Sequence, residues 1–88
     1  MNWAYSFTEG ARKEFLKLNR QVQKEILRYF DSRIAGKDNP RRFGKPLRGD
    51  LAGVWRYRVG DYRILCQIRD GQLLVLIVSV GHRKNIYE

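Results

Sequence analysis

Arginine is the residue type with the clearest chemical potential in this chain. Lys and Arg number 18 against 9 Asp and Glu among the 88 residues, which gives a net charge of +9, and Arg outnumbers Lys by 12 to 6. A guanidinium binds phosphate through two parallel hydrogen bonds, and a positive excess of this size attracts polyanions. The plainer alternative is a solvated basic surface. We expect an anionic partner, with nucleic acid as the leading candidate.

Three of these arginines flank a turn signal. Arg56 and Arg58 precede Gly60-Asp61, and Arg63 follows it. Gly-Asp between two apolar runs predicts a two-residue hairpin turn, which places Arg58 directly opposite Arg63. Like charges opposed across a sheet are destabilising, and a bound anion would offset their repulsion. The sequence therefore predicts an anion site here, against the alternative that the side chains splay into water or pair with Asp61, Asp50 or Glu88.

The C-terminal stretch adds acid–base chemistry. His82 is the only histidine, and histidine is the side chain that ordinarily titrates near neutrality. Arg83 is a fixed cation, and Tyr87 can stack on a base and donate a hydrogen bond. Regular alternation puts His82 on the arginine face, whereas Arg83 reaches that face only if the chain kinks at Gly81 or the strand ends there. Together with the three arginines these residues suit phosphodiester cleavage, although an isolated histidine is more often an ordinary surface residue.

The single cysteine, Cys66, lies in an apolar run, so the sequence predicts a reduced core thiol rather than a nucleophile or a disulfide. The N-terminus lacks the basic start and apolar core of a signal peptide, and no run reaches membrane-spanning length. We expect one domain over residues 1–88, soluble and cytoplasmic, with no membrane partner.

Periodicity indicates which elements position these residues. Residues 3–7 alternate as a strand does, and apolar residues from Ala11 to Ile34 recur every three or four positions, as on a helix face. Asn19 is a cap between two helices, and Gly36 is a stop signal. The expected elements are a strand at 3–7, helices at 9–18 and 20–35, a basic loop at 37–50, and strands at 54–59, 62–69 and 72–80, with a second two-residue turn at 70–71. This is an α+β fold in which a short N-terminal strand and an αα-hairpin accompany an antiparallel sheet of about four strands, with the hairpin packed on one face.

The predicted register divides the sheet residues between two faces. The core face is expected to hold Trp55, Tyr57, Val59, Tyr62, Ile64, Cys66, Ile68, Leu73, Val75 and Ile77. The opposite face is expected to hold Arg56, Arg58, Arg63, Gln67, Leu76, Val78 and His82.

Two motifs carry a family resemblance. Trp55 to Ile64 reads Arg-x-Arg followed by Gly-Asp-Tyr-Arg, and the chain closes on His-Arg-x-x-x-Tyr from His82 to Tyr87. With the order of elements, these motifs resemble the RelE/ParE superfamily of type II toxins over nearly the whole chain. The resemblance implies a ribosome-associated endoribonuclease that cleaves mRNA without metal or cofactor. The RNA 2′-hydroxyl attacks the adjacent phosphate, and a cognate antitoxin wraps and neutralises the toxin.

The resemblance also implies roles for single residues. Arg56 and Arg58 match positions that hold phosphate, Arg63 matches the arginine that stabilises the transition state, and Arg83 and Tyr87 match the closing basic and tyrosine positions. Relatives often have lysines where Arg56 and Arg58 stand; because guanidinium is a poor proton acceptor, a base role shifts to His82 or Tyr87. Basic residues outside this set are expected to contact RNA or ribosomal RNA phosphates: Arg41, Arg42, Lys45, Arg48 and Lys84.

Two other functions share these features. A ParE-like toxin would poison DNA gyrase by protein contact without cutting RNA. A plain RNA-binding module would use the sheet as a stacking platform, but its aromatic residues would have to lie on the arginine face, whereas the register places Trp55, Tyr57 and Tyr62 inward.

Overall fold

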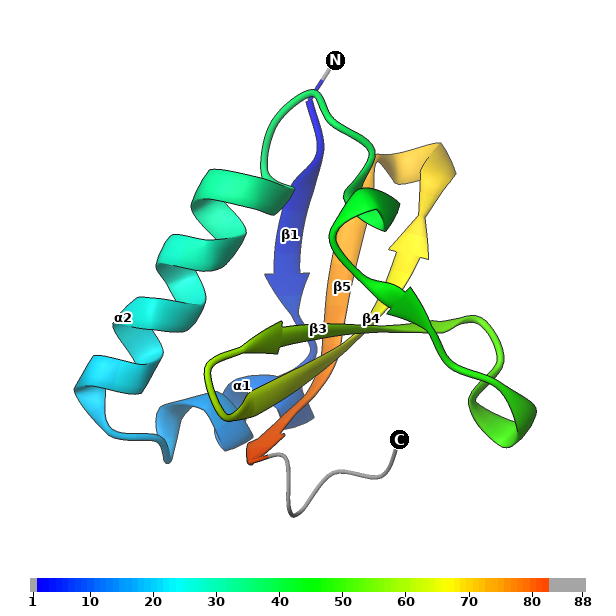
Figure 1. Cartoon of the computed structure of the whole chain (residues 1–88). Coiled ribbons are helices and arrows are strands. Elements are labelled where there is room, and N and C mark those ends of the chain that lie inside the picture. Colours follow the sequence, from blue (N-terminus) through cyan, green and yellow to red (C-terminus); the bar gives the residue numbers. More distant parts are fainter. Residues whose placement is uncertain (1, 83–88) are drawn as a thin grey trace.

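Within residues 2–82, α1 and α2 pack on a five-stranded mixed sheet. Figure 1 shows how these elements are arranged. The structure is a computed structural model and describes residues 2–82. The strand order is β1-β5-β4-β3-β2, with β1 parallel to β5 and every other pair antiparallel. The elements are β1 Ala4–Phe7, α1 Glu9–Leu16, α2 Arg20–Tyr29, β2 Lys45–Pro46, β3 Val54–Val59, β4 Tyr62–Arg69 and β5 Leu74–His82.

The predicted α+β class and the helical hairpin on one face are confirmed. The sheet differs in detail, because within residues 2–82 it has five strands rather than about four and is mixed rather than wholly antiparallel. The direction of β1 depends on its pairing with β5, about 70 residues later in the chain. No local turn links these two strands, so nothing in the nearby sequence signals their parallel arrangement.

Both helices begin at side-chain caps. The Thr8 hydroxyl accepts from the Ala11 amide at 3.1 Å, and the Asn19 side chain accepts from the Val22 amide at 2.9 Å. These bonds satisfy amides that have no partner in the first helical turn. α2 runs on into one π-helical turn, Phe30–Ile34, and the chain then reverses through Gly36 at φ 134°. The predicted helix starts and the glycine stop are thus confirmed.

The core lies between α2 and one face of the sheet. Ile26, Phe30 and Ile34 are fully buried on the helical side, and Tyr57 is fully buried on β3. The Phe30 and Tyr57 rings meet edge-on with centroids 5.6 Å apart. Burial of these large side chains is the main stabilising contribution available to a chain of this size. Because α2 packs on this face, the opposite face of the sheet is not covered by it.

The β3–β4 register agrees with the prediction at every pair from Trp55 to Val59, including Arg58 opposite Arg63. Gly60 takes φ 58° while Asp61 keeps a negative φ, as a type II′ turn requires. The turn chemistry therefore fixed this hairpin.

The β4–β5 turn does not follow the prediction. Asp70 to Gln72 form a single 3₁₀ turn, Leu73 takes a left-handed φ of 49°, and Arg69 pairs with Leu74. The loop thus has four residues rather than two, β5 begins at Leu74, and Leu73 belongs to the turn and not to the core face. Four-residue hairpin loops built on a helical turn are a common solution, and this one does not use Gly71 at positive φ.

A β-bulge changes the face of every residue near the end of β5. Cys66 pairs with Ile77, but the next residue of β4, Leu65, pairs with Ser79, so Val78 is an extra residue. After the bulge Val80 faces the core with 3% of its surface exposed, and His82 lies opposite Tyr62. The predicted placement of His82 on the arginine face is therefore wrong, because an inserted residue inverts the alternation.

Candidate functional site

Cross-strand pairing brings four cations together on the sheet face that α2 leaves uncovered. Arg58 pairs with Arg63 across β3 and β4, and Lys45 pairs with Arg56 across β2 and β3. Residues paired directly in an antiparallel ladder project to the same side, and Arg56 and Arg58 are two positions apart on one strand. We call Lys45, Arg56, Arg58 and Arg63 the basic cluster. It contains two cross-strand pairs of like charge.

The members of the basic cluster differ in exposure. Arg63 has only 5% of its surface exposed and is the one buried charged residue among residues 2–82, whereas Arg56 is half-buried and Arg58 is exposed. An arginine stays protonated at any physiological pH. Because Arg63 is buried, the fold holds its guanidinium at a defined position. A permanent positive charge therefore lies beside the more accessible charges of Arg56 and Arg58. Such fixed charges stabilise an anion with little reorganisation.

Lys45 joins the cluster through a strand that the sequence did not reveal. Residues 37–50 were predicted to form a loop, in which Lys45 would contact ribosomal RNA. The pairing of β2 with β3 instead places it beside Arg56. A side-chain Cβ at Gly44 would lie 2.9 Å from Cε1 of Tyr57, so only glycine lets the chain approach the sheet there. The glycine before Lys45-Pro46 is the sequence feature that could have indicated this close approach to the sheet.

The other basic residues of this segment are less concentrated. Arg41 donates to both carboxylate oxygens of Asp70, at 2.9 and 2.7 Å, and these bonds lower the pKa of the Asp70 carboxyl. Arg42 lies 3.6 Å from Asp38, one turn earlier in the chain. Arg48 is exposed. Arg41 is thus held by two short hydrogen bonds to its acidic partner, whereas Arg42 has only the longer and more exposed pair with Asp38.

Two reactive side chains lie inside the core and not at the basic cluster. Cys66 is fully buried, and burial raises the pKa of its thiol well above the ordinary value. The Tyr57 hydroxyl donates to the buried Pro40 carbonyl at 2.8 Å, and burial also raises the pKa of this phenol. Neither group is available as a nucleophile or base at neutral pH. The inward prediction for both residues is confirmed.

The predicted catalytic set is only partly brought together. Arg56, Arg58 and Arg63 share one face, whereas His82 packs against Tyr62 on the other side, with ring centroids 5.3 Å apart and an interplanar angle of 81°. Arg83, Lys84 and Tyr87 lie outside the described residues. Gly81, the last position of β5 on the arginine face, lies opposite Arg63.

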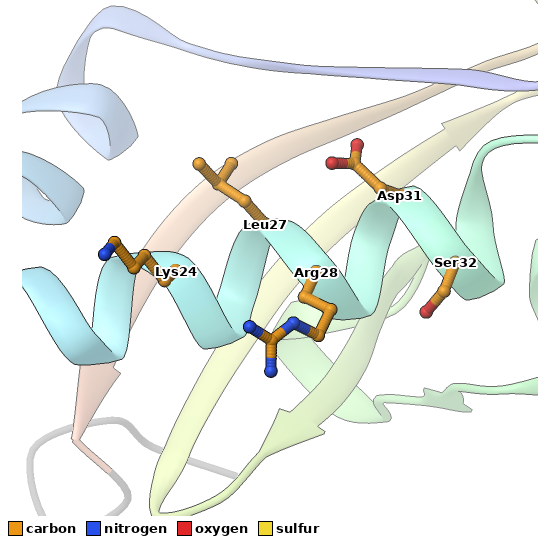
Figure 2. A pocket seen from close by; sticks show the side chains of 5 residues that line it. All are labelled: Lys24, Leu27, Arg28, Asp31 and Ser32. Atoms are coloured by element: carbon orange, nitrogen blue, oxygen red, sulfur yellow. The ribbon is translucent and has the colours of Figure 1, made fainter.

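A second surface feature, a shallow hollow along α2 and the π-helical turn that continues it, does not resemble a binding site. Figure 2 shows Leu27 and Asp31 pointing to one side of the helix and Arg28 and Ser32 to the other, so these side chains do not converge. Asp31 already accepts from the Tyr5 hydroxyl at 2.6 Å. Within residues 2–82 no cluster of three metal-ligating side chains occurs, and no helix there has the length and apolar character needed to cross a bilayer.

Comparison with known proteins identifies the family. A family model described as the ParE toxin of the type II toxin–antitoxin system parDE matches residues 5–87. Toxin RelG of Mycobacterium tuberculosis is 36% identical over 87 residues, covering 99% of this chain and 98% of the relative. The chain belongs to the RelE/ParE superfamily of type II toxins. A putative RelE-like toxin protein of Escherichia coli is 30% identical to this toxin over 86 residues, covering 96% of the chain and 86% of the relative.

Solved structures of relatives share the fold of this toxin. The RelBE2 toxin–antitoxin complex of Mycobacterium tuberculosis contains a chain with a TM-score of 0.84 and 33% identity, covering 97% of this toxin and 95% of that chain. The intact RelBE complex of Escherichia coli gives a TM-score of 0.74 at 26% identity, covering 91% and 95%. The arrangement of two helices on a five-stranded sheet is therefore that of RelE-like toxins.

Proposed function

We propose that this toxin is an mRNA endoribonuclease that acts at the ribosome without metal and inhibits translation. The observation that carries the proposal is the basic cluster, in which the buried Arg63 lies directly opposite the exposed Arg58. A sheet does not gain stability from opposing two arginines, so the arrangement is best explained by an anion that binds between them. The RNA phosphodiester is the anion that a RelE-like toxin would meet.

The chemistry follows from permanent cations. The RNA 2′-hydroxyl gives up its proton and attacks the adjacent phosphorus, and the bond to the 5′-oxygen breaks. The departing 5′-oxygen takes up a proton, so that a 2′,3′-cyclic phosphate and a 5′-hydroxyl result. Negative charge on the phosphate oxygens rises in the pentacoordinate transition state, and the guanidinium groups of Arg56, Arg58 and Arg63 stabilise it. Removal of one such fixed charge is expected to slow cleavage by about 10²–10³-fold.

Proton transfer needs a group that arginine does not supply. His82 packs on Tyr62, away from the basic cluster, so it acts on the reacting atoms only if it leaves that contact. We therefore assign the proton acceptor to Tyr87 before His82, and a further phosphate contact to Arg83, both on the basis of the family motif.

Docking and regulation complete the proposal. Arg42, Lys45, Arg48 and Lys84 contact mRNA or ribosomal RNA phosphates, so binding weakens as the salt concentration rises. Two of the solved structures of relatives, RelBE2 of Mycobacterium tuberculosis and RelBE of Escherichia coli, are toxin–antitoxin complexes. We propose a separate cognate antitoxin for this toxin as well.

Poisoning of DNA gyrase is the second candidate function, because the family model that matches is named for ParE. The relatives named RelG and RelE-like favour the nuclease instead. Protein contact with gyrase would give the basic cluster no chemical task.

A translating extract distinguishes the two. Wild-type toxin should cut mRNA at ribosomal A sites and leave cyclic-phosphate ends, while gyrase supercoiling stays intact. Arg58→Gln should slow cutting by about 10²–10³-fold without opening the core, because this side chain is exposed. The matched variant Arg12→Gln, on the exposed surface of α1, should cut normally. Intact mRNA together with inhibited supercoiling would replace the nuclease by the gyrase poison. His82→Gln tests the proton assignment, since a changed pH–rate profile would return His82 to the mechanism.

A further inference from the structure

An ion pair ties the segment before β2 to the far end of the sheet. Both terminal nitrogens of Arg41, in the helical turn Pro40–Arg42, donate to the carboxylate of Asp70 in the β4–β5 turn, at 2.9 and 2.7 Å. Figure 1 shows the green turn of Pro40–Arg42 beside the turn that joins β4 and β5. A paired fork of this kind is the geometry in which an arginine and a carboxylate hold each other most firmly.

Two further contacts fix the same turn. The Arg41 guanidinium lies 5.8 Å from the centroid of the Trp55 ring, within the range of cation–π attraction. The Pro40 carbonyl accepts from the buried hydroxyl of Tyr57 at 2.8 Å, and the Pro40 side chain is itself fully buried. Residues 40–41 are thus joined both to β3, through Tyr57 and Trp55, and to the β4–β5 turn, through Asp70.

The strand that follows needs such support. β2 has only two residues, and the second, Pro46, has no amide hydrogen to give to the ladder. Beyond it the Leu47 amide donates to the Val54 carbonyl at 2.9 Å. A two-residue edge strand with so few ladder bonds is marginal by itself. Its register against Arg56 depends on what fastens the chain before it.

We propose that Arg41 and Asp70 form a clasp that positions Lys45 in the basic cluster. This inference rests on the proposed function and reassigns Arg41, which the sequence suggested as an RNA contact. The clasp holds β2 in register with β3, and the ammonium of Lys45 then stands beside Arg56 when RNA binds. Asp70 thus assists the binding of an anion although it is acidic. It does not contact the anion but holds the backbone that positions Lys45.

The test compares two removals of one negative charge. Asp70→Asn removes the charge and one of the two acceptors of the clasp, whereas Asp38→Asn removes the charge from the pair with Arg42 in the same segment and leaves the clasp intact. Hydrogen exchange of the Leu47 amide reports whether β2 remains paired. We expect exchange about two- to fivefold faster in Asp70→Asn and unchanged in Asp38→Asn, since an accessible ion pair makes a contribution of this order.

Cleavage kinetics with programmed ribosomes test the link to Lys45. Asp70→Asn should raise KM about two- to fivefold with kcat unchanged, and Lys45→Met should raise KM at least as much. In the double variant Asp70→Asn should add nothing to the effect of Lys45→Met, because the residue that the clasp positions is gone. Asp38→Asn measures the effect of the charge change alone on RNA affinity.

The clasp and its link to Lys45 can be refuted independently of each other. Equal Leu47 exchange in Asp70→Asn and Asp38→Asn would overturn the clasp. Faster exchange with fully additive effects on KM would overturn the assignment to Lys45. If wild-type toxin cuts no RNA, the proposed function fails, and amide exchange still decides whether the clasp holds β2.

Discussion

Arg58 offers a test in which stability and activity move in opposite directions. Its side chain is exposed and lies directly opposite the cation of Arg63. Like charges in this position cost roughly 0.2–1 kcal/mol of folding free energy. Arg58→Gln removes the repulsion and keeps a long polar side chain, so the free energy of unfolding should rise by that amount. For a domain of this size the rise corresponds to a Tm higher by roughly 1–8 °C.

The same substitution removes a charge from the proposed phosphate site. Cleavage in the translating extract should therefore fall by about 10²–10³-fold while the protein becomes more stable. Salt supplies an independent check on the origin of the stability. The Debye length is about 30 Å at 0.01 M and about 3 Å at 1 M, so the gain should be largest at low salt and nearly vanish at 1 M.

Arg69 provides the matched control. It is an exposed arginine on β4, like Arg58 on β3, but its cross-strand partner is Leu74. Arg69→Gln should change stability by less than about 0.5 kcal/mol and should not depend on salt in the same way. The reasoning would be refuted if Arg58→Gln lowered the Tm at low salt, or if both variants raised it equally.

Three other substitutions or reactions test the packing around the site. Tyr57→Phe should lower the free energy of unfolding by about 1–3 kcal/mol in urea titrations, because the buried Pro40 carbonyl loses its donor; an unchanged midpoint would show that this bond contributes nothing. Glu14, whose carboxylate accepts from the Val80 amide at 2.9 Å, should tolerate replacement by Gln better than by Ala, as measured by exchange of that amide; equal exchange in the two variants would contradict its role as an acceptor. The Cys66 thiol should resist alkylation in native toxin and react once urea unfolds it, and rapid native labelling would show that the thiol is not buried as described.

Local chemistry explains which elements the sequence could predict. Thr8 and Asn19 cap helices through bonds to amides three residues away, and Gly60-Asp61 closes a hairpin whose partners follow immediately. Such interactions depend on neighbours in the chain, so composition and spacing contain the necessary information. The opposition of Arg58 and Arg63 followed directly from the second of these turns.

The second hairpin lacked this information. Residues 73–78 read Leu-Leu-Val-Leu-Ile-Val, an unbroken apolar run in which no alternation marks the two faces. Along residues 74–77, β5 pairs with β1 on one side and with β4 on the other, so neither of its edges is open there. An extra residue at Val78 therefore left no trace in the pattern, and its effect on His82 appeared only in the pairing with Tyr62.

The sequence by itself determined the class of fold, the helix starts, the β3–β4 register and the three arginines that share a face, because each of these is encoded by contacts within a few residues. Only the tertiary structure decided that β1 is parallel to β5, that His82 faces Tyr62 and that Lys45 stands beside Arg56. These depend on pairings between distant segments, whose free energy comes from burial and ladder bonds formed across the whole sheet. The basic cluster thus depends on both kinds of interaction. A local hairpin turn places Arg58 opposite Arg63, and a clasp between distant segments is proposed to hold Lys45.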